Sequence, residues 1–213
     1  MRRRRNTFYI AISALSLAIL LSACRATIRI GTQTWTVKNL SVQIFRNGDT
    51  IPQAMTDEEW IHAAQEKKPA WCYYQNDSLN GKKYGKLYNW YAVSDRRGLA
   101  PKGLHIPDNE EWKILADCLG GEKVAGGKLK AKPSWDSPNI GATDSCMFSG
   151  LPGGLRDYDG TFNGLGSSAG WWTASAGDTE RAWDWFLLYN SAYIHATLDA
   201  KALGLSVRCL KNK

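Results

Sequence analysis

The sequence contains few of the residues that bind metal ions or carry out acid, base and nucleophilic chemistry. It has three histidines and five cysteines, and no two cysteines form a CxxC pair. His62, His105 and His195 lie far from the cysteines along the chain, so the ligand spacing of a zinc site is absent. The stretch "GGEKVAGGKL" is not a phosphate loop, because Glu122 and Leu129 stand where that motif needs glycine and serine or threonine. We therefore expect no metal, no cofactor and no catalytic residue.

The chain also lacks an apolar run long enough to cross a membrane as a helix. The longest run, from Phe8 to Ala23, falls short of the roughly 20 residues that a bilayer requires. It follows four arginines and ends in "LSAC", a pattern that indicates an export signal and resembles the lipobox of bacterial lipoproteins. We expect residues 1–23 to be a signal peptide, Cys24 to carry the lipid, and residues 24–26 to form a short tether. An uncleaved membrane anchor is the alternative.

A continuous basic surface is missing as well. Arg2 to Arg5 belong to the expected signal, and the remaining basic residues barely exceed the 20 acidic ones. No stripe of lysine and arginine interleaved with aromatic residues is left, which excludes a nucleic-acid-binding protein. The lipid on Cys24 would attach the protein to a membrane. Arg25 is not the aspartate associated with inner-membrane retention, so we expect the outer membrane, with either a surface-exposed or a periplasm-facing domain.

The residues after the tether predict one domain over residues 27–213. It opens with "TIRIGTQTWTV", in which apolar and polar residues alternate on both sides of Gly31-Thr32. Such alternation around a glycine-containing dipeptide predicts a two-stranded hairpin. Only Arg25 and Ala26 separate this hairpin from the lipidated cysteine, so the domain would lie close to the membrane.

Two helices are predicted from their start signals. Thr56 is followed three residues later by Glu59, and Asp108 stands in the same relation to Glu111, which is the pattern of a capping box. The first helix should run to about Lys67. The second should end at Gly120-Gly121. Its inward-facing residues would be Trp112, Leu115 and Leu119.

The C-terminal part of the sequence has the two-residue period of β-strands. "WWTAS", "AWDWFLLY", "NSAYIHATL" and "LGLSVRCL" predict four strands of an antiparallel meander. One face of the second strand is too apolar to lie in water, so we expect it to be core. That face comprises Trp183, Trp185, Leu187 and Tyr189. Trp171 shares its side with Thr173 and Ser175 and is predicted to be exposed.

The loop-rich segment 150–171 is the candidate ligand-binding region. Its glycines allow a ligand to approach the backbone, its acids, amide and arginine can bind hydroxyl groups, and its rings offer flat faces. The candidate residues are Arg156, Asp157, Tyr158, Asp159, Asn163 and Trp171. The alternative is structural, with Arg156 and Asp157 tying the loop to the domain and Tyr158 filling a gap. "DYDG" is a fragment of a calcium loop but has no further acid at the required spacing, so a turn is favoured there.

Six blocks of the chain, taken together, resemble a known family. They are "IGTQTWTVKNL", "YGKLYNWYAV", "GLAPKGLHIPDNEEW", "LPGGLRDYDGTF", "GWWTAS" and "LGLSVRC". Their order and spacing are similar to those of the Fibrobacter succinogenes major paralogous domain family. The resemblance implies an α+β, C-type lectin-like domain with two helices, small antiparallel sheets, long irregular loops and paired N- and C-terminal strands. Family members are mostly exported proteins of Bacteroidota and Fibrobacterota, often lipoproteins, with no established general activity.

The resemblance also bears on the cysteines, for which the sequence alone leaves three pairings open. By analogy with lectin-like domains it implies a Cys118–Cys209 disulfide, which leaves Cys72 and Cys146 as a second pair. The chain departs from the family at Ala100, where a cysteine is common, and at Thr36. The similar formylglycine-generating enzymes use two nearby cysteines for copper, and only Cys209 lies in the comparable region.

These observations favour a non-catalytic lipoprotein that binds a glycan or a protein partner. A structural subunit of an outer-membrane or surface assembly is the alternative, and the short tether suits it. A thiol- or metal-dependent oxidoreductase on the formylglycine-generating scaffold is a third hypothesis, which would need two neighbouring cysteines in a pocket.

Overall fold

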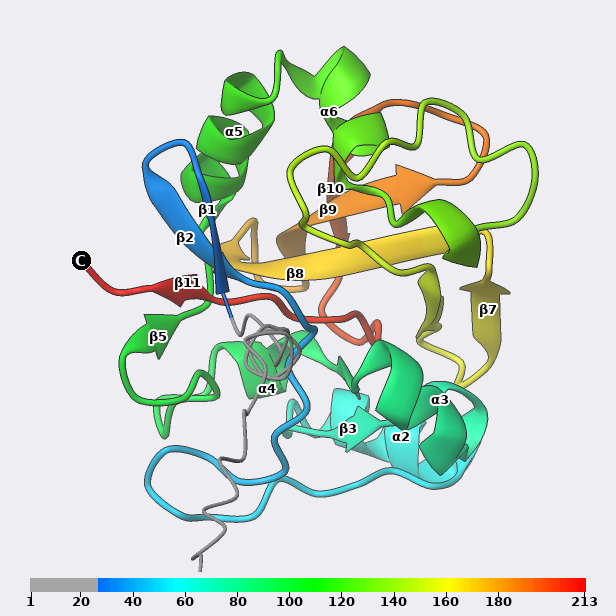
Figure 1. Cartoon of the computed structure of the whole chain (residues 1–213). Coiled ribbons are helices and arrows are strands. Elements are labelled where there is room, and N and C mark those ends of the chain that lie inside the picture. The colour runs from blue at the N-terminus through cyan, green and yellow to red at the C-terminus, as the bar shows by residue number, and fades with distance from the viewer. Residues whose placement is uncertain (1–26) are drawn as a thin grey trace, which may run out of the picture.

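The computed structural model describes residues 27–213, and the predictions on the signal peptide, Cys24 and the tether lie outside these residues. No helix within residues 27–213 is long and apolar enough to cross a membrane. The architecture is mixed α+β, with several short helices around two main sheets and a small third one (Figure 1).

The predicted N-terminal hairpin is confirmed. Strands β1 (Thr27–Ile30) and β2 (Gln33–Thr36) pair antiparallel around Gly31, whose φ of 57° suits a residue without Cβ. β2 also pairs with β11 (Leu210–Lys211), which in turn pairs with β5 (Leu104–His105). The pairing of the N- and C-terminal strands that the resemblance implied is therefore present.

Both predicted helices form and begin as expected. Helix α2 (Asp57–Gln65) has a complete capping box between Thr56 and Glu59, and α5 (Asn109–Cys118) has one between Asp108 and Glu111. The three residues predicted to face inward, Trp112, Leu115 and Leu119, are all buried.

The expectation of only two helices is wrong, because three more form. These are α3 (Ser78–Tyr84), α4 (Trp90–Val93) and α6 (Glu122–Leu129). They are short, and contacts with other parts of the chain stabilise them. A Cβ on Gly126 of α6 would lie 2.2 Å from the carbonyl oxygen of Tyr193, so the glycines of "GGEKVAGGKL" allow close packing against a loop. Two 3₁₀-helices, η1 (Tyr74–Asn76) and η2 (Lys132–Ser134), and a small sheet of β3 (Trp71–Cys72) and β4 (Leu87–Tyr88) complete the connections.

A five-stranded sheet with the order β10-β9-β8-β6-β7 forms the centre of the molecule. Its strands are β6 (Gly153–Arg156), β7 (Phe162–Leu165), β8 (Ser168–Ala176), β9 (Arg181–Leu188) and β10 (Ile194–Ala200). The three strands β8, β9 and β10 form the predicted meander. The predicted fourth strand does not join it, since "LGLSVRCL" runs across single bridges to Tyr88, Arg156 and Trp171 and ends as β11 in the other sheet.

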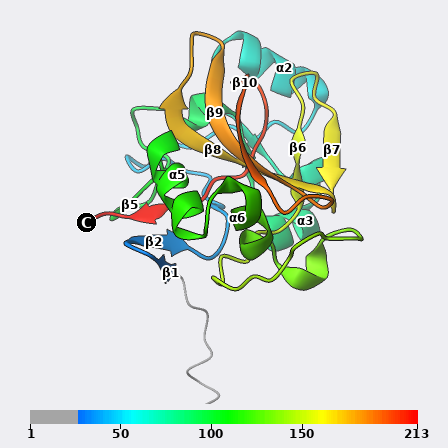
Figure 2. The same ribbon diagram turned by 90° about the horizontal axis from the view of Figure 1, so that it is seen from above.

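Helices lie on both sides of this sheet. Figures 1 and 2 show α5 and α6 on one side of β8 and β9, and α2 and α3 on the other. The first hydrophobic core lies under α5 and α6 and includes Trp35, Trp112, Phe148, Trp171 and Trp185. The second lies against the opposite face and includes Trp172, Ala182, Leu205, Val207 and Cys209. A third, smaller core beneath α2 includes Trp60, Cys72 and Leu87.

The predicted exposure of Trp171 is wrong. Its ring is fully buried in the first core, 5.8 Å from that of Trp112, and its Nε1–H donates to Asn39 Oδ1 at 2.9 Å. The neighbouring Trp172 is equally buried, in the second core. Of the face of β9 predicted to be core, Trp185 and Leu187 are buried, whereas Trp183 and Tyr189 are half-buried.

Candidate functional site

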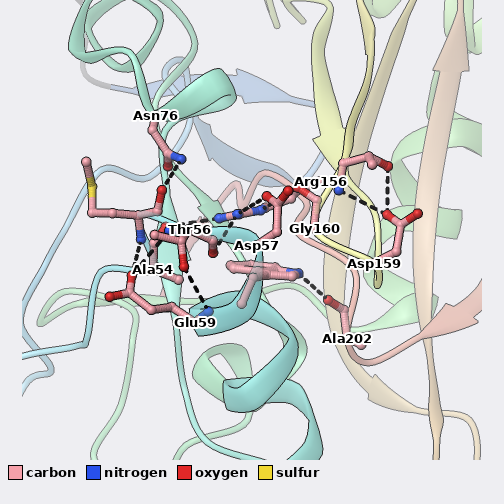
Figure 3. A network of polar contacts seen from close by, with 12 residues as sticks. Ala54, Thr56, Asp57, Glu59, Asn76, Arg156, Asp159, Gly160 and Ala202 are labelled. Atoms are coloured by element: carbon pink, nitrogen blue, oxygen red, sulfur yellow. Dashed lines mark hydrogen bonds and ion pairs between the residues drawn. The ribbon is translucent and has the colours of Figure 1, made fainter.

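Arg156 is a structural residue, which corrects its prediction as a ligand-binding one. Its side chain is fully buried at the end of β6, between the rings of Trp60 and Phe162. The guanidinium donates to the carbonyl oxygens of Gly160, Ala54 and Thr56 at 2.9–3.0 Å and to Asp57 Oδ1 at 3.0 Å (Figure 3). The structural alternative for this residue is therefore correct, although its acidic partner is Asp57 and not Asp157.

This network fixes the turn after β6 to the start of α2. A Cβ on Gly160 would lie 2.5 Å from the Cβ of Asp57, so turn and helix touch directly. Within the turn, Asp159 Oδ1 accepts hydrogen bonds from the backbone N–H and hydroxyl of Thr161, and Asp157 Oδ1 accepts one from the N–H of Tyr158. No group of three His, Cys, Asp or Glu residues suited to a metal ion occurs within residues 27–213. The two aspartates thus serve as turn residues that hold Tyr158 outward.

An open groove lies between this turn and the outer strands of the central sheet. We call it the Tyr158 groove, and its volume is about 620 Å³. Its turn side is formed by Asp157 and by Tyr158, whose side chain is 63 % exposed. The sheet side belongs to the face of β9 and β10 opposite the first core. The sheet-side residues are Phe186, Leu188, His195, Thr197, Asp199 and Ala200, with Leu155 and Leu203 at the inner end.

A buried carboxyl group lies next to the polar residues of this groove. Asp184 is opposite Thr197 in the β9–β10 register and accepts a hydrogen bond from its hydroxyl. The pKa of Asp184 is raised from 3.8 to about 8, mainly because the carboxyl group is buried; the hydrogen bond from Thr197 opposes this shift and the nearby Asp199 carboxylate adds to it. Asp184 Oδ2 has no hydrogen-bond partner among the described residues. A proton on Oδ2 agrees with the raised pKa and gives this oxygen a partner, because the protonated carboxyl group would donate a hydrogen bond to Asp199.

We expect the free energy of unfolding to fall as the pH rises from about 4 to about 8, because folded Asp184 keeps a proton that the unfolded chain has lost. The stabilisation is complete below the unfolded pKa of 3.8 and is lost as the pH passes the folded pKa. Asp184→Asn cannot titrate and should flatten this slope, whereas Asp159→Asn in the exposed turn should not. Urea denaturation at a series of pH values measures both. An unchanged slope in Asp184→Asn contradicts the assignment.

The structure brings together only part of the predicted ligand-binding set. Asp157 and Tyr158 line the groove, Asp159 and Asn163 are exposed outside it, and Arg156 and Trp171 are internal. The sheet-side residues of the groove were missed. A signal for them existed, since the period of β9 places Asp184, Phe186 and Leu188 together on the face opposite Trp185. That period does not say which of the two faces remains open.

The predicted disulfides are wrong, because all four described cysteines are free thiols. Cys118 is exposed at the end of α5 beside Gly31, whereas Cys209 is buried in the second core. Cys72 belongs to the third core, and Cys146 packs against the first. Each predicted pair would thus join separate parts of the molecule.

Two of these thiols also bear on the oxidoreductase hypothesis. Burial raises the pKa of Cys72 and of Cys209 to about 12, so neither is a thiolate at neutral pH. Because the thiolate is the reactive form, this arrangement does not favour thiol chemistry. The groove offers instead ring faces and hydrogen-bonding groups that suit non-covalent binding.

Comparison with known proteins supports the resemblance seen in the sequence. The family model described as the Fibrobacter succinogenes major domain matches residues 28–211, a range that includes nearly all of the three sheets, all three cores and the groove. No curated protein and no solved structure matches the chain. A match over this share of the sequence shows that the chain belongs to the Fibrobacter succinogenes major domain family.

Proposed function

We propose that this protein is an outer-membrane lipoprotein whose Tyr158 groove binds a glycan without chemical change. The observation that carries the proposal is the Tyr158 ring, which is 63 % exposed at the rim of a largely apolar groove beside two aspartates. A sugar ring can stack on Tyr158 and Phe186. Its hydroxyl groups can bind Asp157, Thr197 and Asp199. The terminal strand pairing supports a C-type lectin-like arrangement of the domain.

The turn that presents Tyr158 is held in place before any ligand arrives. Arg156 and Gly160 attach it to α2, so the backbone that carries the ring need not be ordered on binding. Such preorganisation reduces the entropic cost of association. A protein partner that inserts a hydroxyl-rich or basic segment would use the same residues, and a glycan array distinguishes the two.

Tyr158→Ala should weaken glycan binding at least tenfold, equivalent to about 1.4 kcal/mol, because the stacking face is removed. The melting temperature should stay within a few degrees, since an exposed ring adds little to stability. A glycan array followed by titration calorimetry on the best ligand measures the effect. Tyr91→Ala, at a half-buried tyrosine on α4 outside the groove, is the matched control. Equal affinity of Tyr158→Ala and the unaltered protein would rule out this site.

Membrane attachment is tested separately at Cys24. Without the sulfur that accepts the diacylglycerol, Cys24→Ser should remain a precursor that is not cut between Ala23 and residue 24. Mass spectrometry and membrane fractionation report both properties, and Cys118→Ser, at an exposed cysteine, should mature normally. Normal maturation of Cys24→Ser would disprove the lipid anchor. Protease shaving of intact cells then shows which side of the outer membrane the domain faces.

A structural subunit of a surface assembly is the second candidate. The first strand starts at Thr27, only three residues after Cys24, so at ~3.5 Å per residue it begins within about 10 Å of the lipid. A tether this short suits a fixed position at the membrane more than reach toward distant ligands. Cross-linking in intact cells that recovers a constant set of partners, in a strain where Tyr158→Ala has no effect, would favour this function.

A further inference from the structure

A second cavity, separate from the Tyr158 groove, is lined by basic residues from three parts of the chain. We call it the Arg208 pocket, and its volume is about 380 Å³. It lies between the segment after β2, the end of α3, and residues 149–151. Lys38, Lys82 and Lys83 are exposed at this pocket, and Arg208 is buried in its wall.

Arg208 is a buried cation whose hydrogen-bond partners are all uncharged. Its Nε–H donates to Asn39 Oδ1 at 2.7 Å, its Nη1 donates to the carbonyl oxygens of Thr36 and Phe148 at 2.8 Å, and its Nη2 donates to that of Ser149 at 3.3 Å. No carboxylate within the described part of the chain forms an ion pair with it. Its nitrogens all donate hydrogen bonds, and the Asp144 carboxylate is near enough to interact with it electrostatically, but no anion contacts it directly. An anion in the pocket would supply the contacting counter-charge that buried cations normally have.

The surrounding lysines are also without acidic partners. None of the ion pairs found over residues 27–213 uses Lys38, Lys82, Lys83 or the neighbouring buried Lys86. The dipole of α3 favours cations in its last turn, which accounts in part for two of them. It does not account for Lys38 and Arg208, which come from other segments. The pocket therefore concentrates positive charge in a domain whose basic and acidic residues nearly balance.

We propose that the Arg208 pocket binds a phosphate group, presented by an anionic lipid headgroup. Arginine and lysine are the side chains that recognise phosphate in proteins. The position of the pocket favours a lipid as the source of the phosphate. Thr27 is paired with Thr36, and Lys38 follows two residues later, so the pocket lies near the first described residue and hence near the proposed lipid anchor. The choice of a lipid over free phosphate rests on the proposed anchor at Cys24, whereas the phosphate chemistry does not. Headgroup binding would orient the domain on the membrane.

The test uses the full chain reconstituted in vesicles of phosphatidylcholine, with or without phosphatidylglycerol, at physiological ionic strength. Amide hydrogen exchange of residues 37–41 and 81–85 should slow at least fivefold only when phosphatidylglycerol is present. Inorganic phosphate added to the phosphatidylcholine vesicles is the second arm. If it protects the same residues equally well, the phosphate chemistry holds and the lipid source is overturned. No protection in either arm overturns the proposal.

A charge-matched pair of variants separates the pocket from general attraction to an anionic surface. The triple variant Lys38→Gln, Lys82→Gln, Lys83→Gln should lose the protection and keep its melting temperature, since all three side chains are exposed. The control variant Lys102→Gln, Lys123→Gln, Lys132→Gln removes the same charge from exposed lysines elsewhere and should keep the protection. An equal loss in both variants overturns a specific site.

Discussion

Arg156→Met is expected to lower the free energy of unfolding by about 3–5 kcal/mol, among the largest effects of a single substitution in this chain. Methionine fills a similar volume but leaves the carbonyl oxygens of Ala54, Thr56 and Gly160 without their donor. For a domain of this size the melting temperature should fall by roughly 10 °C. Thermal and urea unfolding followed by circular dichroism measure the change.

Arg181→Met provides the matched control for Arg156→Met. Arg181 pairs with Asp178 at the surface, where ion pairs contribute at most about 1 kcal/mol. Its loss should therefore shift the melting temperature little. If both variants are equally stable and only Arg156→Met loses glycan binding, Arg156 is a ligand-binding residue and the structural assignment fails.

Trp171→Ala should cost a similar amount, about 3–5 kcal/mol, because it opens a cavity in the first core. It also removes the donor to Asn39, whose side-chain oxygen accepts from Arg208 as well. The loss should therefore extend toward the Arg208 pocket. Trp171→Phe keeps most of the buried ring and should lose about half as much. Urea denaturation gives both values, and a stable Trp171→Ala protein that fails to bind glycan would contradict the buried position.

The two tryptophans of "GWWTAS" explain why the sequence could not locate the site correctly. Alternation predicts that Trp171 and Trp172 point in opposite directions, and the structure agrees. Exposure of one of them follows only if one face of the strand is open to water. Because β8 is an internal strand that packs against α5 on one face and against α4 on the other, both rings are buried. Trp171 was thus assigned to the wrong environment from a correct period.

Local signals in the sequence determined several parts of this protein. The capping boxes at Thr56 and Asp108 and the turn at Gly31 depend on residues at most a few positions apart, so their chemistry can be read directly from the chain. The family followed from six short blocks in order. For Tyr158 the local signals predicted the turn but left open whether the ring is exposed or fills a gap, and the structure shows it exposed.

Only the tertiary structure decided what each charge and thiol contacts. Charged residues are mostly exposed, so a sequence reading places Arg156 at the surface, but its acceptors at Ala54 and Thr56 lie about 100 residues away. The sequence likewise does not show that Arg208 donates to Thr36, that the four cysteines stay unpaired, or that Asp184 lies beside Asp199. These contacts arise from packing between distant segments, and no local pattern in the sequence encodes which segments meet.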